Sequence, residues 1–169
     1  MEWTEAGLRS ALFEGFVPVV GRQNLAIPDR PGVFIVLHNE TTANPFMAAN
    51  PAGRFRGKDP SVDRQKLTSK WLMNSSAVYI GAASGGGRGD RTLRRRLEEL
   101  RRFGAGEPTA HWGGRYLWQL TNSHRLLVCW KETSAQQAQV TKSELLDEFQ
   151  EQFGALPFAN LKRGNQIQA

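Results

Sequence analysis

Short apolar runs alternate with amphipathic segments along this chain, and this alternation restricts the fold more than any other feature. Val33–Leu37 and Ala77–Gly81 are two such runs, each bounded by turn residues and each typical of a buried strand. Segments 90–103 and 135–153 instead repeat their apolar residues with the period of a helix, and the second ends at Gly154. Further strand candidates are residues 116–120 and 125–131. The sequence therefore predicts an α/β (α+β) fold, with helices flanking a small sheet.

The length of 169 residues predicts a single domain over residues 1–169. Leu8 and Leu12 are spaced by one helical turn, which predicts a short N-terminal helix over about residues 4–14. Residues 39–74 are rich in Asn, Pro, Gly and basic side chains and have no sustained period. We therefore expect an inserted loop region there.

The chain is basic, with a formal net charge of +6 and a pI of about 10. This charge is compatible with nucleic acid as a partner, although ribosomal and membrane-surface proteins share it. Cys129 is the only cysteine, which excludes an intramolecular disulfide and a cysteine-rich zinc site. No apolar stretch approaches the roughly 20 residues that span a bilayer, and the N-terminus does not resemble a signal peptide. We therefore expect a cytoplasmic protein without a membrane partner.

One arginine of the first amphipathic segment lies where apolar side chains are expected. At 100° per residue, Arg96 projects beside the apolar face of segment 90–103. That face consists of Leu93, Leu97, Leu100 and Phe103. An unpaired buried charge is very costly, so two interpretations of Arg96 remain. The side chain either extends its head to the rim of the domain, or is held there to bind a phosphate.

The second amphipathic segment places Lys142 near the centre of its inner face, whereas Glu144 lies on the outer side. The other inner residues are apolar: Ala135, Ala138, Leu145, Leu146, Phe149 and Phe153. We therefore expect Lys142 to line a polar cleft. Glu144 would face inward only if the helix were rotated by about 160°.

Several short motifs, taken in their order along the chain, resemble the GIY-YIG nuclease superfamily. Gly32-Val33-Phe34 and Tyr79-Ile80-Gly81 resemble the two tripeptides of that superfamily. Arg96 lies on the helix that follows, and Pro157-Phe158-Ala159-Asn160 follows the last helix. The block from His111 to Leu120 also looks like a segment of bacterial members. The resemblance covers about residues 30–161 and implies a small antiparallel sheet with the two tripeptides on neighbouring strands.

In nucleases of this superfamily a tyrosine helps to activate the attacking water, and a helix arginine steadies the scissile phosphate. The resemblance thus implies these roles for Tyr79 and Arg96. A glutamate on the last helix of such nucleases holds a divalent metal, usually Mg²⁺. His111 is a further candidate, either as a proton donor or acceptor near the cleft or as a structural turn residue.

Two residues depart from the family pattern. Phe34 lacks the phenolic oxygen of the first tripeptide's tyrosine. Counting back from the aliphatic pair Leu145 and Leu146, Lys142 occupies the place of the metal-binding glutamate. A lysine cannot bind Mg²⁺, because it offers an ammonium group where a carboxylate oxygen is needed. The metal is therefore expected only if a carboxylate such as that of Glu144 fills this place.

Basic residues outside this site are candidates for contacts with the nucleic-acid backbone. Seven arginines lie between residues 88 and 102, and residues 54–58 interleave basic with aromatic side chains. A solvated helix face and an ordinary exposed loop are the alternatives. The candidates are Arg88, Arg91, Arg95, Arg56 and Lys58. Asn160 matches the terminal Asn of the family and either fixes the last loop to the site or bonds its own backbone.

The resemblance implies a metal-dependent DNA endonuclease, which hydrolyses phosphodiester bonds. Phe34 and Lys142 support two other interpretations: an inactivated nuclease, or a non-catalytic module that binds nucleic acid. A protein-interaction domain that kept only the fold is a third. In all of these interpretations except the protein-interaction domain, the expected partner is nucleic acid, and DNA is the first candidate.

Overall fold

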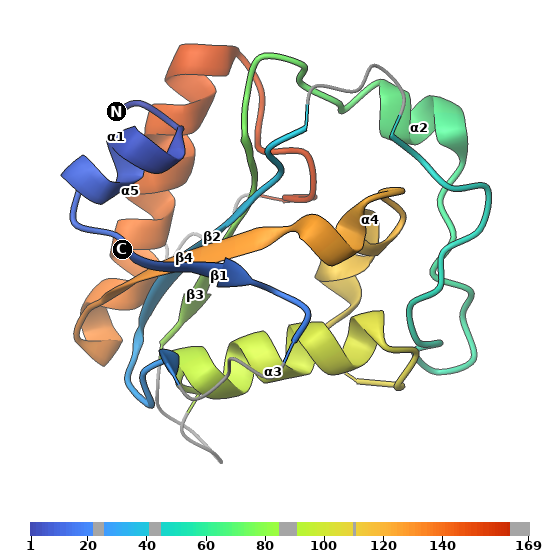
Figure 1. Cartoon of the computed structure of the whole chain (residues 1–169), viewed down its shortest axis with the longest axis horizontal. Coiled ribbons are helices and arrows are strands. Elements are labelled where there is room, and N and C mark those ends of the chain that lie inside the picture. Colours follow the sequence, from blue (N-terminus) through green and yellow to red (C-terminus); the bar gives the residue numbers. More distant parts are fainter. Residues whose placement is uncertain (22–25, 41–44, 85–90, 110, 163–169) are drawn as a thin grey trace.

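A computed structural model describes residues 1–21, 26–40, 45–84, 91–109 and 111–162. Within these residues four strands form one sheet, ordered β1-β4-β2-β3, and each neighbouring pair is antiparallel (Figure 1). The strands are β1 (Glu14–Pro18), β2 (Gly32–Leu37), β3 (Ala77–Ala83) and β4 (Leu127–Glu132). The helices are α1 (Glu5–Ser10), α2 (Arg64–Thr68), α3 (Leu93–Gly104), α4 (Arg115–Trp118) and α5 (Ala135–Phe153). The predicted mixed fold, a small antiparallel sheet with helices, is confirmed.

Helices cover both faces of the sheet, so apolar side chains of the strands are buried on either side. In Figure 1, α1 and α5 lie together at one end of the molecule and α3 runs along the other side of the strands. Val33, Ile35 and Leu37 of β2 join the core cluster that contains residues of α1 and α5. Phe34 and Val36 join the cluster that contains residues of α3 and α4. This alternation follows from the two-residue period of a strand.

The two long helices begin at capping residues, and the second also ends at its predicted glycine, whereas α3 runs through Gly104 to Ala105. Thr92 precedes α3, and its hydroxyl accepts a hydrogen bond from the Arg95 N–H at 3.3 Å. Gly154 ends α5 with a φ of 72°, a left-handed conformation that suits glycine. The predicted range 135–153 of the last helix is confirmed. Asp90, the first residue of the predicted segment 90–103, lies outside the described residues.

The predicted strand at residues 116–120 is wrong. Residues 112–114 form a single 3₁₀ turn that leads directly into α4. Tyr116, Leu117 and Trp118 are all buried, so the segment shows neither the alternation of a half-buried strand nor the stripe of a surface helix. A short apolar run of this kind does not distinguish the two structures.

The first strand was not predicted, and the N-terminal helix is shorter than the predicted range 4–14. Leu12 has a φ of 65°, so the chain leaves the helical conformation after Ser10. β1 lies at the edge of the sheet, carries a bulge after Gly15 and ends at Pro18. Its side chains are exposed or half-buried, which removes the apolar alternation by which a strand is recognised in a sequence.

The inserted region 39–74 is more ordered than predicted, because it contains α2 and packs into the core through Phe46, Leu67 and Trp71. The buried Gln119 side chain holds it: its oxygen accepts from the Val62 N–H at 2.8 Å, and its amide donates to the carbonyls of Met47 and Val62. None of the helices in the described part of the chain is long and apolar enough to cross a membrane.

Candidate functional site

The predicted catalytic residues come from β3, an edge strand of the sheet, from α3 and α5, and from the segment that precedes α4. Tyr79 lies on β3 opposite Val36 and is 9% exposed. Burial raises the pKa of its hydroxyl above the ordinary value of 10.0, and the charge of Arg96 opposes this rise. Tyr79 is therefore a neutral hydroxyl at physiological pH. It can orient a water or donate a hydrogen bond.

His111 lies beside Tyr79 and is almost completely buried. The two ring centroids are 6.4 Å apart in an edge-to-face arrangement. Neither ring nitrogen of His111 has a hydrogen-bond partner among the residues that the structure describes. Burial, together with the charge of Arg96, lowers the pKa of this imidazole to about 3. His111 is thus a neutral imidazole with unused hydrogen-bonding capacity, which is unusual for a buried polar group.

Arg96 projects from α3 beside the packed stripe, as predicted, and its side chain is mostly buried. Its guanidinium donates to the Glu99 carboxylate at 2.8 Å, one helical turn further on. This ion pair supplies the partner that a partly buried arginine requires. The Glu99 side chain is more exposed than that of Arg96, so its carboxylate can turn toward solvent and release the Arg96 guanidinium.

Lys142 projects from α5 and is half-buried, next to the buried pair Leu145 and Leu146. Burial lowers the pKa of its ammonium group below the ordinary 10.5, and the charge of Arg96 lowers it further. The two cations therefore lie within electrostatic reach of each other, although α3 and α5 pack on opposite faces of the sheet. That Lys142 lines a polar cleft stays a prediction.

Arg96 links the whole group, because its charge acts on Tyr79, His111 and Lys142 alike. Like charges brought together repel each other, and a bound anion between them relieves the repulsion. Arginine and lysine are also the side chains that most often contact phosphate in proteins. The positive charge of Arg96 thus acts close to a neutral tyrosine and a neutral histidine.

The residues present do not fit Mg²⁺. Glu144, the alternative metal ligand, is exposed and lies two residues from Lys142, on the other side of the helix. Among the described residues, no group of three or more His, Cys, Asp or Glu side chains could hold a metal ion. Glu99 is the carboxylate that contacts Arg96, and it is engaged in that ion pair. A divalent cation beside Arg96 and Lys142 would meet two positive charges in place of the oxygen ligands it requires.

Asn160 fixes the segment that follows α5 to β3 and so positions the strand that carries Tyr79. Its side-chain oxygen accepts from the Ile80 N–H and its amide donates to the Ile80 carbonyl, both at 2.9 Å. These backbone groups point away from β2, at the edge of the sheet, and Asn160 takes the place of a neighbouring strand. The side chain is buried and both of its polar atoms bond to Ile80, which favours the interpretation in which Asn160 fixes the last loop, and its contact with nucleic acid stays a prediction.

Replacing Asn160 with alanine should lower the free energy of unfolding by about 2–4 kcal/mol, because two buried backbone groups of Ile80 lose their partner. Urea denaturation followed by circular dichroism measures this change. Asn39→Ala is the matched control, since Asn39 is exposed, and it should have almost no effect. Equal effects of the two substitutions would contradict the positioning role.

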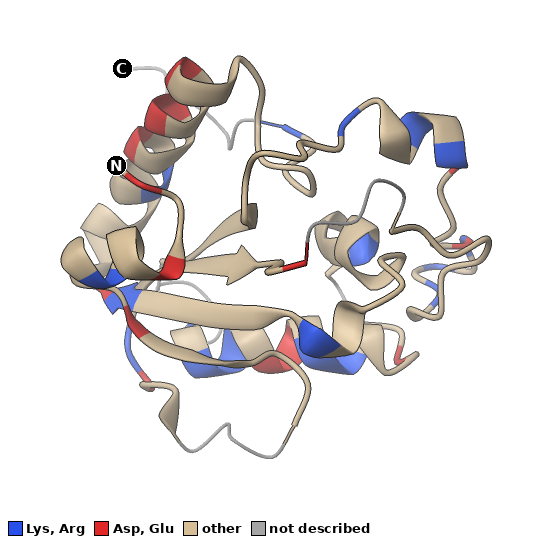
Figure 2. Ribbon diagram, turned by 45° about the horizontal axis from the view of Figure 1, so that its top comes forward, with Lys and Arg blue, Asp and Glu red and all other residues tan. Residues whose placement is uncertain are grey.

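The other basic candidates lie at the surface. Arg91 and Arg95 are exposed at the beginning of α3, and Arg56 and Lys58 are exposed in the turn at residues 56–57. Arg88 lies outside the described residues. Figure 2 shows blue basic segments along α3, whereas the outer side of α5 is largely acidic. The charge of the chain is thus unevenly distributed, with basic residues on and near α3.

Sequence reasoning assigned no role to several residues that contact the site's supporting segments. Lys70 donates to the Asn160 carbonyl at 3.3 Å, and its ammonium lies 5.8 Å from the centre of the Tyr116 ring.

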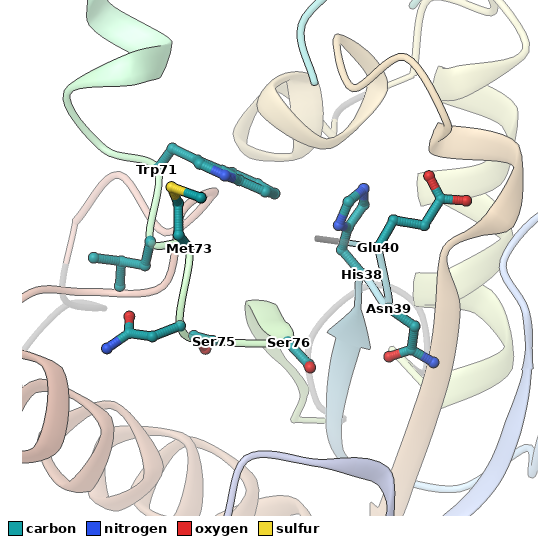
Figure 3. Close-up of a pocket in the computed structure, with 9 residues that line it drawn as sticks. His38, Asn39, Glu40, Trp71, Met73, Ser75 and Ser76 are labelled. Carbon is teal, nitrogen blue, oxygen red and sulfur yellow. The ribbon is translucent and has the colours of Figure 1, made fainter. Parts of the chain in front are cut away.

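A separate cavity of about 280 Å³ opens where β2 ends and β3 begins. Trp71 and Met73 lie on one side of it and His38, Asn39 and Glu40 on the other (Figure 3). The spacing of these residues in the sequence carries no motif that would have indicated the cavity.

Comparisons with known proteins provide no family assignment: no protein-family model matches the chain, and neither do the curated proteins and solved structures with which it was compared.

Proposed function

We propose that this chain is a nucleic-acid-binding domain of the GIY-YIG nuclease type, in which Arg96 and Lys142 bind one phosphate of the backbone. The proposal depends on a single observation, the shared electrostatic environment of Arg96, Lys142 and the buried pair Tyr79 and His111. The GIY-YIG relationship is supported by the two tripeptides, which lie on the neighbouring antiparallel strands β2 and β3 and meet where Phe34 pairs with Gly81. It is also supported by the arginine on the following helix.

In this proposal, the residue at position 142 determines whether the site binds a strand or cuts it. A phosphate held by two cations is bound tightly, but a site without carboxylate ligands has no means of holding a catalytic divalent metal. The chain is therefore a binding domain that retains the scaffold of a nuclease. Glu99 covers Arg96 in the free protein, and a phosphate would replace this carboxylate.

A second candidate, DNA endonuclease activity of the chain as it stands, is favoured by His111. A neutral imidazole without a hydrogen-bond partner among the described residues can hold a water molecule by accepting a hydrogen bond from it, whereas its pKa of about 3 makes it a weak proton acceptor. Tyr79, 6.4 Å away between ring centres, would orient that water. This activity would not require a metal.

Supercoiled plasmid distinguishes these functions. The chain, Lys142→Glu and Lys142→Gln are incubated with plasmid in Mg²⁺ and then in EDTA, and binding is followed separately by gel retardation. We expect the unchanged chain to retard the plasmid without nicking it. Lys142→Glu should nick it in Mg²⁺ only, because it adds a carboxylate beside Arg96, whereas the neutral Lys142→Gln should not nick it.

Other outcomes would redirect the assignment. Nicking by the unchanged chain in EDTA would favour the second candidate, and nicking by it in Mg²⁺ alone would contradict the metal-free description of the site. Absence of both retardation and nicking would leave the protein-interaction domain as the remaining interpretation.

A further inference from the structure

A tight turn at residues 54–58 presents basic side chains at the surface. The Lys58 N–H donates to the Phe55 carbonyl at 3.1 Å, and the two residues form an isolated antiparallel bridge. Arg56 and Gly57, at the tip, have φ values of 51° and 76°, as in the two-residue turns that join hairpin strands. A Cβ added at Gly57 would meet no atom within 4 Å, so the tip projects into solvent.

Two aromatic rings connect this turn with the candidate site. Phe55 lies 6.5 Å from Trp112 between ring centres, and both side chains are half-buried. Trp112 directly follows His111, whose ring packs on Tyr79. Aromatic side chains therefore continue from the buried pair at β3 to the exposed turn, and part of the surface of Phe55 and of Trp112 remains accessible.

Cations flank both rings. The guanidinium of Arg56 lies 5.2 Å from the centre of the Phe55 ring, and that of Arg115 lies 4.8 Å from the Trp112 ring. Burial lowers the pKa of Arg115, which is consistent with its position between the Trp112 and Tyr116 rings. Among the described residues, neither of these arginines nor Lys58 forms a salt bridge, whereas the neighbouring Arg54 pairs with Asp59 at 3.3 Å.

We infer that Phe55 and Trp112, with Arg56 and Arg115 beside them, form a surface that stacks on unpaired bases of single-stranded nucleic acid. Exposed rings interleaved with cations are the combination that binds single strands without base-specific contacts, since every base has a face on which a ring can stack. A duplex keeps these faces inside its own stack. The inference rests on the proposed function and names its substrate: a strand whose phosphate lies at Arg96 and whose bases extend toward the turn.

Fluorescence anisotropy tests this surface with labelled oligodeoxyuridylate and oligouridylate of about 15 nucleotides, and with a DNA duplex of the same length. Phe55→Ala and Trp112→Ala should each weaken binding of the single strands about ten-fold and change duplex binding little. Trp112→Phe should retain most of the affinity, because it keeps a ring. The tighter of the two single strands identifies the sugar that the chain prefers.

Phe16→Ala is the matched control, because Phe16 is also half-buried and has the guanidinium of Arg9 4.0 Å from its ring centre. It should leave all three affinities unchanged. Unchanged single-strand binding in Phe55→Ala and Trp112→Ala would overturn the inference, as would an equal loss on the duplex. Arg96→Ala should weaken binding of all three probes, so a failure of the phosphate site is recognised separately.

Discussion

Lowering the pH from about 7 to about 4.5 will destabilise the folded chain. His111 alone contributes a loss of roughly 1.4 kcal/mol for each pH unit below the ordinary pKa of histidine. The pKa of His111 is lowered by burial and by Arg96 from the ordinary 6.5 to about 3. Above about pH 6.5 the imidazole is neutral in both the folded and the unfolded chain. Below it only the unfolded chain takes up the proton, so stability is lost as the pH falls toward 3.

Urea denaturation at a series of pH values measures this loss, and His111→Phe should remove most of the slope between about pH 6.5 and 4.5. His38, whose pKa burial also lowers, contributes in the same direction, and His38→Phe should remove a smaller part. Replacing the exposed His124 with glutamine is the control and should leave the slope unchanged. An unaltered slope in His111→Phe would contradict the burial of a neutral imidazole at this position.

Gly81→Ala will destabilise the fold by about 3 kcal/mol, because the added Cβ would lie 2.2 Å from the Cζ atom of Phe34. Phe34 is directly opposite Gly81 in the sheet and is completely buried, so its ring has no free space into which to move. Gly113→Ala is the matched control: an added Cβ there meets no atom within 4 Å. That substitution should change stability by less than about 0.5 kcal/mol.

A double-mutant cycle with Phe34→Ala tests the cause. Phe34→Ala alone should cost about 3–5 kcal/mol through the lost ring. Combined with Gly81→Ala, it should cost clearly less than the sum of the two single changes, because the added methyl group then has space. Additive costs would show that a clash between these two residues is not the reason why Gly81→Ala destabilises the fold. The contact also gives Phe34 a packing role: its ring covers a glycine of the neighbouring strand.

Patterns within single elements were sufficient to predict the two longest helices. The period of the apolar residues and Gly154 predicted α5 over its full length. The same wheel placed Lys142 near the centre of the inner face, where the structure has it half-buried. Arg96 was found in the same way, since its position depends only on the geometry of α3. Both residues could be identified as charges at the edge of a core before any tertiary contact was known.

Features that depend on contacts between distant segments were not predictable from local patterns. Asn160 forms hydrogen bonds with Ile80, 80 positions away in the sequence. Gln119 forms hydrogen bonds with residues of the inserted region that lie more than fifty positions away. Neither side chain belongs to a periodic stripe, so the sequence showed only isolated polar residues. The burial of His111 is of the same kind, because it results from packing against Tyr79 and Gly114.

The proposed function places an anion between two cations that approach from opposite faces of the sheet. This differs from a nuclease with a carboxylate on the last helix, because one residue, Lys142, changes the sign of the charge that the site presents. Under this proposal, the residue at this position of α5 determines whether the scaffold binds or cuts a strand. The aromatic surface at Phe55 and Trp112 would then select strands with unpaired bases.

The titration of the Lys142 ammonium group, followed by NMR with and without a saturating single-stranded oligonucleotide, tests the central claim most directly. In the free chain its pKa should lie below 10.5, and Arg96→Ala should raise it, since burial and Arg96 together lower it. In the unchanged chain, binding of the strand should also raise the pKa of Lys142, because a phosphate in contact with the ammonium group favours its charged form. A Lys142 pKa that does not change when the strand binds would contradict a phosphate shared between Arg96 and Lys142.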